Sequence, residues 1–147
     1  MARITEVLEV PIAPERAFDH VADFTTTAGW DPGINRAERL DAGEIGEGAR
    51  FQVQLKLGPV EVPLVYEITT YERPHRVVLT TVGPTHRGED DVTFAPSGTG
   101  TRVTWNARFA LRGPGLLVDP ALGVGFRRAA KEAVAGLELS LRELAAR

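Results

Sequence analysis

The chain contains no cysteine. That absence excludes disulfide bonds, thiolate zinc sites and thiol nucleophiles, whatever fold the chain adopts. No apolar run approaches the ~20 residues that a membrane-spanning helix needs. The opening residues, MARITEVLEV, do not have the basic flank and unbroken apolar core of a signal peptide. We therefore expect a cytoplasmic protein without integral membrane association.

Motifs for metal-, phosphate- or nucleotide-dependent chemistry are also missing. The sequence has no GxSxG or HExxH pattern, no phosphate-binding loop and no dinucleotide-binding fingerprint. Its three histidines, His20, His75 and His86, are scattered and do not form a metal-ligand cluster by spacing. The formal net charge is −3, whereas a nucleic-acid-binding domain normally presents a basic face. We expect no metal, no cofactor and no nucleic-acid partner.

The first third of the chain predicts a strand followed by two short helices. Residues 4–11 form an apolar-rich strand, and Pro14 suits the first turn of a helix because its missing N–H costs nothing there. A second short helix is expected over residues 24–30, where Gly29 and Pro32 end it. The whole chain of 147 residues fits a single domain over 1–147.

The middle of the chain changes to a period of two, which is typical of strands with one buried face. The segments joined by short turns span 50–57, 60–68, 76–82, 85–94 and 101–111, with a loop expected over 95–100. Successive strands with short turns predict an antiparallel meander. From about residue 120 to 146 the period becomes helical, with an apolar stripe along one face. The layout is α+β.

Three features together resemble the START/Bet v 1-like (SRPBCC) superfamily, in its polyketide cyclase/dehydrase-like branch. They are VPIAPERAFDHVADF at 10–24, GWDP at 29–32, and the meander followed by a long terminal helix. The resemblance implies a helix-grip fold, in which a curved seven-stranded antiparallel sheet surrounds the last helix and leaves a cavity. Members of this superfamily include lipid and hormone binders, cyclases and co-chaperones, so the fold does not select a function.

The turns also predict which side chains share the concave face of the sheet, because opposed residues in paired strands point to the same side. We expect Thr81 to lie opposite His86, His86 opposite Phe109, and Asp90 opposite both Val77 and Trp105. One inward row then contains Phe51, Tyr66, Thr81, His86 and Phe109, and a second contains Thr70, Val77, Asp90 and Trp105.

An apolar cavity with a few convergent polar groups is typical of a small-molecule site. The predicted ligand-binding residues are Phe24, Trp30, Phe51, Tyr66, Thr81, His86, Trp105, Phe109 and Phe126. Three alternatives stay open from the sequence. Tyr66 and His86 also fit a satisfied core pair, Asp90 also fits a solvated charge run, and Trp30 also fits a plug at the sheet edge.

We expect the chain to bind a small hydrophobic or aromatic molecule in this cavity. The first alternative is a cofactor-free cyclase or dehydratase that uses His86, Tyr66 or Asp90 for acid/base chemistry on a carbonyl substrate. The second alternative is a protein-interaction module of the co-chaperone type. A free edge strand would also support a homodimer.

Overall fold

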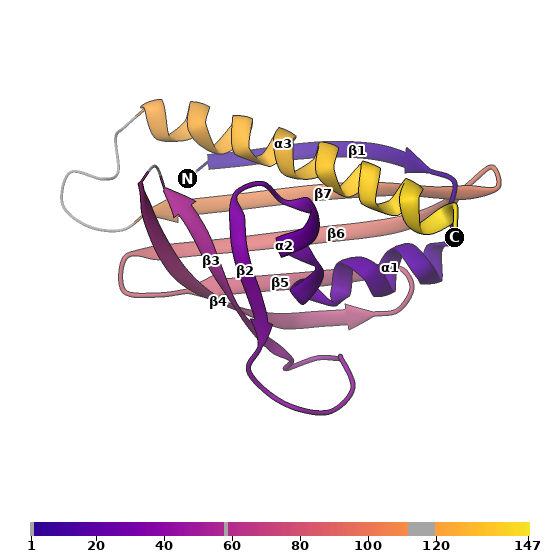
Figure 1. The fold of residues 1–147 in the computed structure, drawn as a ribbon, viewed down its shortest axis with the longest axis horizontal. Coiled ribbons are helices and arrows are strands. Elements are labelled where there is room, and N and C mark those ends of the chain that lie inside the picture. The colour runs from indigo at the N-terminus through magenta and orange to yellow at the C-terminus, as the bar shows by residue number, and fades with distance from the viewer. Residues whose placement is uncertain (1, 58, 112–119) are drawn as a thin grey trace.

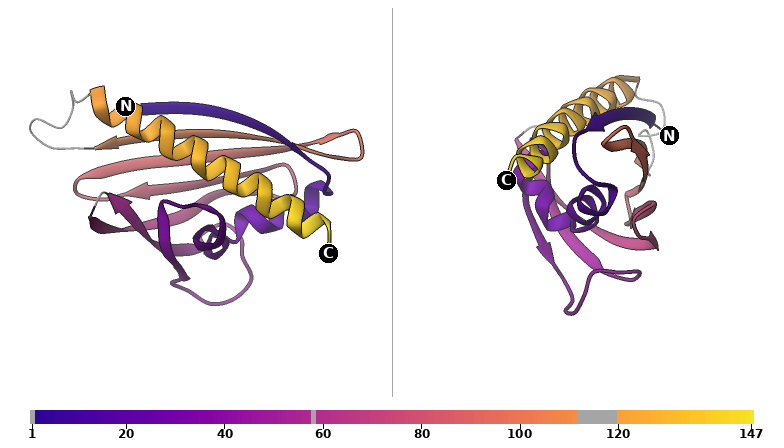
Figure 2. Two further views of the ribbon diagram at one scale, coloured as in Figure 1. Left: turned by 45° about the horizontal axis from the view of Figure 1, so that its top comes forward. Right: turned by 90° about the vertical axis from the view of Figure 1, so that its right-hand side faces the viewer.

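A curled antiparallel sheet forms the body of the molecule, and a long C-terminal helix lies across its open side (Figures 1 and 2). The computed structural model describes residues 2–57, 59–111 and 120–147. In chain order the elements are β1 (Ala2–Val10), α1 (Pro14–Ala22), the 3-10 helix η1 (Phe24–Thr26), α2 (Thr27–Trp30), β2 (Ile34–Arg39), β3 (Arg50–Leu57), β4 (Val60–Glu72), β5 (Arg76–Val82), β6 (His86–Ser97), β7 (Gly100–Leu111) and α3 (Pro120–Ala145).

The strand order is β1-β7-β6-β5-β4-β3-β2, and every neighbouring pair is antiparallel. The meander predicted from the alternating segments is confirmed, as is the α+β helix-grip fold with two short helices after the first strand. The two sheet edges, β1 and β2, are joined through α1, η1 and α2, which lie on the concave side (Figure 2). Within the described residues, no helix combines the length and apolarity that crossing a membrane requires.

The predicted register of the later strands is wrong by two residues. Thr81 lies opposite Gly88, and His86 lies opposite Leu111. Two turns cause these slips. At the β5–β6 turn the Gly83 N–H donates to the carbonyl of His86, so that Val82 lies opposite Arg87. At the β6–β7 turn Ser97 pairs with Gly100, so that Val92 lies opposite Trp105. A slip of two residues keeps each side chain on its face of the sheet, so the predicted inward face survives the error.

The same two-residue slips change the partners predicted for Asp90 in the second row. Asp90 lies opposite Leu79 on β5 and Ala107 on β7, not opposite Val77 and Trp105. The expected loop over 95–100 is also wrong, because β6 continues to Ser97 and pairs with Gly100 across a tight turn. A residue with φ of +59°, Gly98, makes this turn possible.

Thr70 does not belong to the inward row. The ladder between β4 and β5 is regular up to Ile68, which lies opposite Leu79, and then shifts so that Thr70 lies opposite Val78. Thr69 is the extra residue of this bulge, and its hydroxyl pairs with that of Thr80 at 3.0 Å. An inserted residue reverses the face of the side chains beyond it, and here it turns Tyr71 toward the ring of Phe18.

The two halves of α3 pack differently. In the C-terminal half, Leu137 and Leu141 are fully buried, and Gly136 touches the backbone of Trp30. In the N-terminal half the inward positions are mainly alanines, at 129, 130 and 133. Short side chains on one half of a helix leave space that leucines would fill, so α3 contacts its neighbours at one end and leaves a hollow at the other.

Replacing Gly136 with alanine tests this close approach. A Cβ at Gly136 would overlap the carbonyl oxygen of Trp30, whereas a Cβ at Gly125 on the same helix would meet no described atom within 4 Å. We expect Gly136→Ala to lower the free energy of unfolding by more than about 2 kcal/mol, and Gly125→Ala to leave it unchanged or raise it by up to ~1 kcal/mol. Urea unfolding of both variants measures the difference. A Gly136→Ala variant as stable as the parent protein would contradict the packing described.

Candidate functional site

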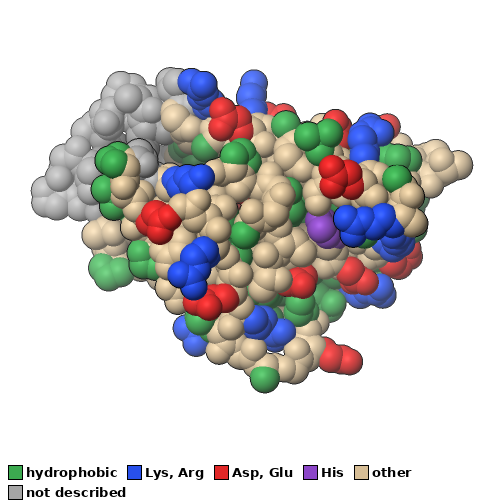
Figure 3. All heavy atoms as spheres, in the orientation of Figure 1, with side chains coloured by type: hydrophobic (Ala, Val, Ile, Leu, Met, Phe, Trp, Pro, Cys, Tyr) green, Lys and Arg blue, Asp and Glu red, His purple; other side chains and the backbone are tan. Residues whose placement is uncertain are grey.

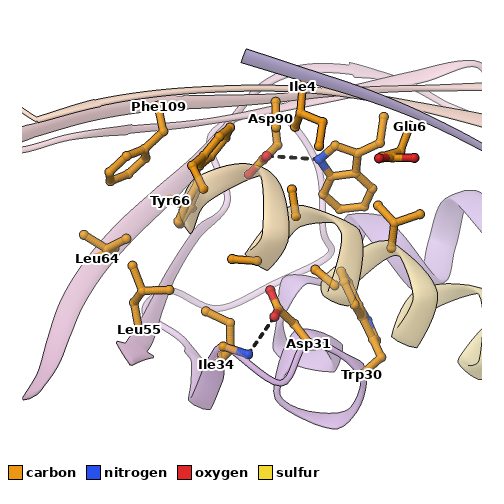
Figure 4. A pocket seen from close by; sticks show the side chains of 18 of the residues that line it. Ile4, Glu6, Trp30, Asp31, Ile34, Leu55, Leu64, Tyr66, Asp90 and Phe109 are labelled. Carbon is orange, nitrogen blue, oxygen red and sulfur yellow. Dashed lines mark hydrogen bonds between the residues drawn. The ribbon is translucent and has the colours of Figure 1, made fainter. Parts of the chain in front are cut away.

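The hollow under the N-terminal half of α3 is a cavity of about 410 Å³. It lies between α3, the α2 region and the inward faces of β1, β4, β6 and β7 (Figure 4). Its aromatic lining comes from segments that are far apart in the sequence: Phe24, Trp30, Tyr66, Trp105, Phe109 and Phe126. A volume of this size is within the range of small-molecule sites.

The aromatic rings support one another, so they form a fixed wall. Trp30 meets Trp105 edge to face with centroids 5.8 Å apart. Elsewhere in the wall, the rings of Phe109 on β7 and Phe126 on α3 stack with centroids 6.1 Å apart, and this contact joins the sheet to the helix. Such pairs add about 0.5–1.5 kcal/mol each beyond their burial, and they hold the rings in defined orientations.

Asp90 is the most perturbed carboxyl group in the cavity. It points inward from β6, and one of its oxygens accepts a hydrogen bond of 3.0 Å from the indole Nε1–H of Trp105. Burial raises the pKa of Asp90 to about 6, because the surrounding apolar wall disfavours the charge more than the indole hydrogen bond favours it. This carboxyl group therefore changes its protonation near neutral pH.

Two further carboxylates line the same space. Asp31 directly follows α2 and accepts a hydrogen bond of 2.8 Å from the backbone N–H of Gly33, while burial raises its pKa. Glu6 occupies the inward face of β1, opposite Trp105 on β7. In Figure 4, Asp31 lies across the cavity from Asp90 and Glu6. Among the described residues no three potential ligands are placed to bind a metal ion.

Tyr66 supplies a neutral hydroxyl group. Burial raises the pKa of its phenol well above the ordinary value, and the negative charges of Asp90 and Asp31 act in the same direction. The phenol therefore stays protonated and able to donate. Within the described residues its hydroxyl makes no hydrogen bond, although its ring packs against Phe24 at 5.0 Å.

The structure brings most of the predicted site residues together. Phe24, Trp30, Tyr66, Trp105, Phe109 and Phe126 line the cavity, and so does the catalytic candidate Asp90. Their contact with a ligand stays a prediction.

Phe51, Thr81 and His86 are not part of the lining. The Thr81 hydroxyl and His86 Nε2 form a hydrogen bond of 3.0 Å, and the imidazole stacks on the outer side of Phe109 at 6.3 Å. Burial lowers the pKa of His86, which favours the neutral ring. Phe51 is fully buried against Phe24. These three residues pack behind the side chains that line the cavity, His86 against Phe109 and Phe51 against Phe24.

Sequence reasoning missed Glu6 and Asp31. Glu6 carried a usable signal, because it falls on the alternate positions of β1 that also contain Ile4 and Leu8. Asp31 carried none, since nothing in the GWDP motif shows where its side chain points. In the acidic run 89–91 the side chains alternate between the two faces of β6. Asp90 points into the cavity, whereas Asp91 and Glu89 form salt bridges on the outer face, Asp91 with Arg76 at 2.9 Å and Glu89 with Arg108.

The cavity and the sheet that grips α3 define a helix-grip protein with an internal small-molecule-sized site. The chain belongs to the family described as polyketide cyclase/dehydrase and lipid transport, which matches residues 1–147. This confirms the resemblance seen in the sequence. No curated protein sequence matches the chain significantly.

Solved structures share the fold at low sequence identity. A START superfamily protein from Mycobacterium smegmatis is 13% identical with a TM-score of 0.81, over 98% of this chain and 99% of that chain. The protein TTHA0849 from Thermus thermophilus is 20% identical with a TM-score of 0.77, over 97% and 96%. The ginseng major latex-like protein 151 from Panax ginseng is 10% identical with a TM-score of 0.72, over 95% and 97%.

The raised pKa of Asp90 predicts a pH-dependent stability difference. In the folded chain this carboxyl group keeps its proton up to about pH 6, whereas in the unfolded chain it loses it near pH 4. The protonated group therefore stabilises the fold at low pH, and this contribution disappears as the pH rises to about 6 and above. Relative to Asp90→Asn, the parent protein should lose about 2 kcal/mol of unfolding free energy between pH 4.5 and 7.5.

Urea unfolding of both proteins at the two pH values measures this difference. Glu67→Gln is the matched control, since it removes one carboxylate from the exposed face of β4 beside Tyr66. Parallel pH profiles for the parent protein and Asp90→Asn would show that Asp90 titrates normally.

Proposed function

We propose that the protein binds a small hydrophobic molecule in the cavity under α3 and carries or sequesters it. The observation that carries this proposal is a partly open, mainly apolar cavity of about 410 Å³ in a chain of 147 residues. The interiors of globular proteins are close-packed, and the few voids that occur in them are seldom larger than a water molecule. A hollow this large, with its walls held by aromatic pairs, reduces stability and is best explained by an occupant.

The family description supports the same conclusion, since it joins cyclase/dehydrase activity with lipid transport. An interaction module that works through its outer surface would gain stability by filling the interior. The space under α3 therefore favours a binding role over that alternative.

N-phenyl-1-naphthylamine, a neutral dye that fluoresces in apolar surroundings, tests the proposal. We expect saturable binding of one dye per chain. Ala130→Trp places a large side chain on the cavity-facing side of α3 and should weaken dye binding at least ten-fold, because the indole occupies the space that the dye needs. Fluorescence titration gives both dissociation constants.

Leu139→Trp is the matched control for this titration. It adds an indole to the same helix at a position that is 64% exposed, so it should bind the dye as the parent protein does. If the dye does not bind, or if it binds Ala130→Trp and the parent protein equally, the cavity is not the binding site.

A second candidate function is acid/base catalysis in the same space, and Asp90 favours it. A carboxyl group whose pKa is about 6, held by Trp105 in an apolar wall, is poised to take or give a proton near neutral pH. Tyr66, whose hydroxyl group makes no hydrogen bond to the described residues, is a second donor in the lining. His86 is outside the lining, so the structure favours Asp90 and Tyr66 among the three candidates.

The elimination of 5-nitrobenzisoxazole reports directly on such a base, since the reaction needs only removal of one carbon-bound proton. We expect a saturable rate that rises with pH around a midpoint near 6 and falls at least ten-fold in Asp90→Asn. Glu67→Gln should keep the parent rate. A rate that is no greater than that of acetate at equal concentration, or one that Asp90→Asn retains, would exclude Asp90 as a base.

A further inference from the structure

We infer that the cavity selects a hydrophobic molecule that ends in a protonated amino group and rejects hydrophobic carboxylates such as fatty acids. This inference rests on the proposed binding function and adds the chemical class of the ligand. It follows from the charges on the cavity wall, from the hydrogen-bonding groups left free there, and from the aromatic rings between them.

The charged side chains of the lining are mostly acidic. Asp90 comes from β6, Asp31 from the segment after α2 and Glu6 from β1, so three separate elements each bring a carboxyl group to one apolar space. The basic residue among the described lining is Lys56, which is exposed. On the face of the molecule that Figure 3 shows, by contrast, acidic and basic side chains are interspersed. The cavity therefore has a negative bias that this face does not share.

This bias is not offset by partners inside the wall. Asp90 accepts from the Trp105 indole and Asp31 accepts from the Gly33 amide, and each of these donors is neutral. Each carboxylate can accept several hydrogen bonds, so both keep capacity that faces the cavity. Elsewhere the chain pairs its carboxylates with cations, as in Asp91 with Arg76 and Asp19 with Arg73. A ligand cation would supply what the wall does not contain.

The space itself indicates a ligand independently of the acids. It is a partly open space with a mainly apolar lining, and the Tyr66 hydroxyl group has no partner among the described residues. The indole of Trp105 lies beside Asp90, to which its Nε1–H donates, and its ring meets that of Trp30 edge to face. Aromatic faces next to carboxylates are suited to an ammonium group, because both attract positive charge. The apolar remainder of such a molecule would lie against Phe109 and Phe126.

A carboxylate ligand fits the same wall poorly. It would bring another negative group into a space lined by carboxyl groups, and the cation of the described lining, Lys56, is exposed, so its attraction is screened by solvent. A ligand that ends in an alcohol can donate to Asp90 but adds no charge attraction. The expected order of affinity is therefore amine, then alcohol, then carboxylate.

Displacement of N-phenyl-1-naphthylamine by three matched compounds tests this order. The compounds are 2-(1-naphthyl)ethylamine, 2-(1-naphthyl)ethanol and the carboxylate 1-naphthaleneacetate. They share one ring system and differ in their polar end. At pH 7.5 we expect the amine to bind at least ten-fold more tightly than the carboxylate, with the alcohol between them. A carboxylate that binds as tightly as the amine overturns the inference, even if the dye shows that the cavity binds. Failure of the dye itself counts against the binding function instead.

Single substitutions assign the preference to the cavity acids. Asp90→Asn should reduce the ratio of amine to carboxylate affinity at least five-fold, while the alcohol changes less than two-fold. Glu67→Gln removes the same charge from the exposed face and should leave the ratio unchanged. If Asp90→Asn, Asp31→Asn and Glu6→Gln all keep the parent ratio, the acids do not select the ligand.

The amine's affinity should also fall between pH 7.5 and pH 5, and that of the alcohol should not. Besides Asp90, the titratable or charged groups that face this space are Glu6, Tyr66, Asp31 and Lys56, and α3 contributes none from its described residues. Protonation of Asp90, whose pKa is about 6, weakens the attraction for the ammonium group. An amine affinity that does not change with pH, or one that falls equally for the alcohol, would contradict the inference.

Discussion

The cavity depends on the way α3 crosses the open side of the sheet. At one end the helix approaches Trp30 so closely that only glycine fits at position 136, and the next turns bury Leu137 and Leu141 completely. Toward the other end the inward side chains shrink to alanine, so the helix stands over the sheet without filling the space beneath it. The close contact fixes the position of the helix, and the small side chains set the volume.

The cavity holds carboxyl groups in mainly apolar surroundings, where charged groups are normally paired with a group of opposite charge. Burying a carboxyl group without a cationic partner is unfavourable, and here the raised pKa of Asp90 records that penalty. The indole of Trp105 and the amide of Gly33 stabilise the acids in fixed orientations but do not neutralise them. Such an arrangement reduces stability in the empty protein, and the ligand that we propose for the cavity explains it most simply.

Much of the fold was predictable because its residues alternate or repeat at helical spacing. Phe51 opposite Tyr66 and Tyr66 opposite Thr81 follow directly from that alternation and are confirmed. The seventh strand, β2, is mostly polar and short, so only the family resemblance indicated it. Turn geometry set the later register, and a bulge at Thr69 reversed Thr70.

The aromatic part of the site was predictable because the inward face survives a two-residue slip. Asp31 was not, since a loop residue has no periodicity from which its direction can be inferred. The inward direction of Glu6 was predictable, because it alternates along β1 with Ile4 and Leu8.

A crystal of the protein under xenon pressure tests the central claim most directly, because xenon enters apolar cavities and scatters anomalously. The account predicts a strong xenon peak in the space between the inward faces of β4 and β7 and the alanines of α3. A structure in which α3 packs down on the sheet, with no xenon there and with Asp90 and Tyr66 turned to the solvent, would contradict it.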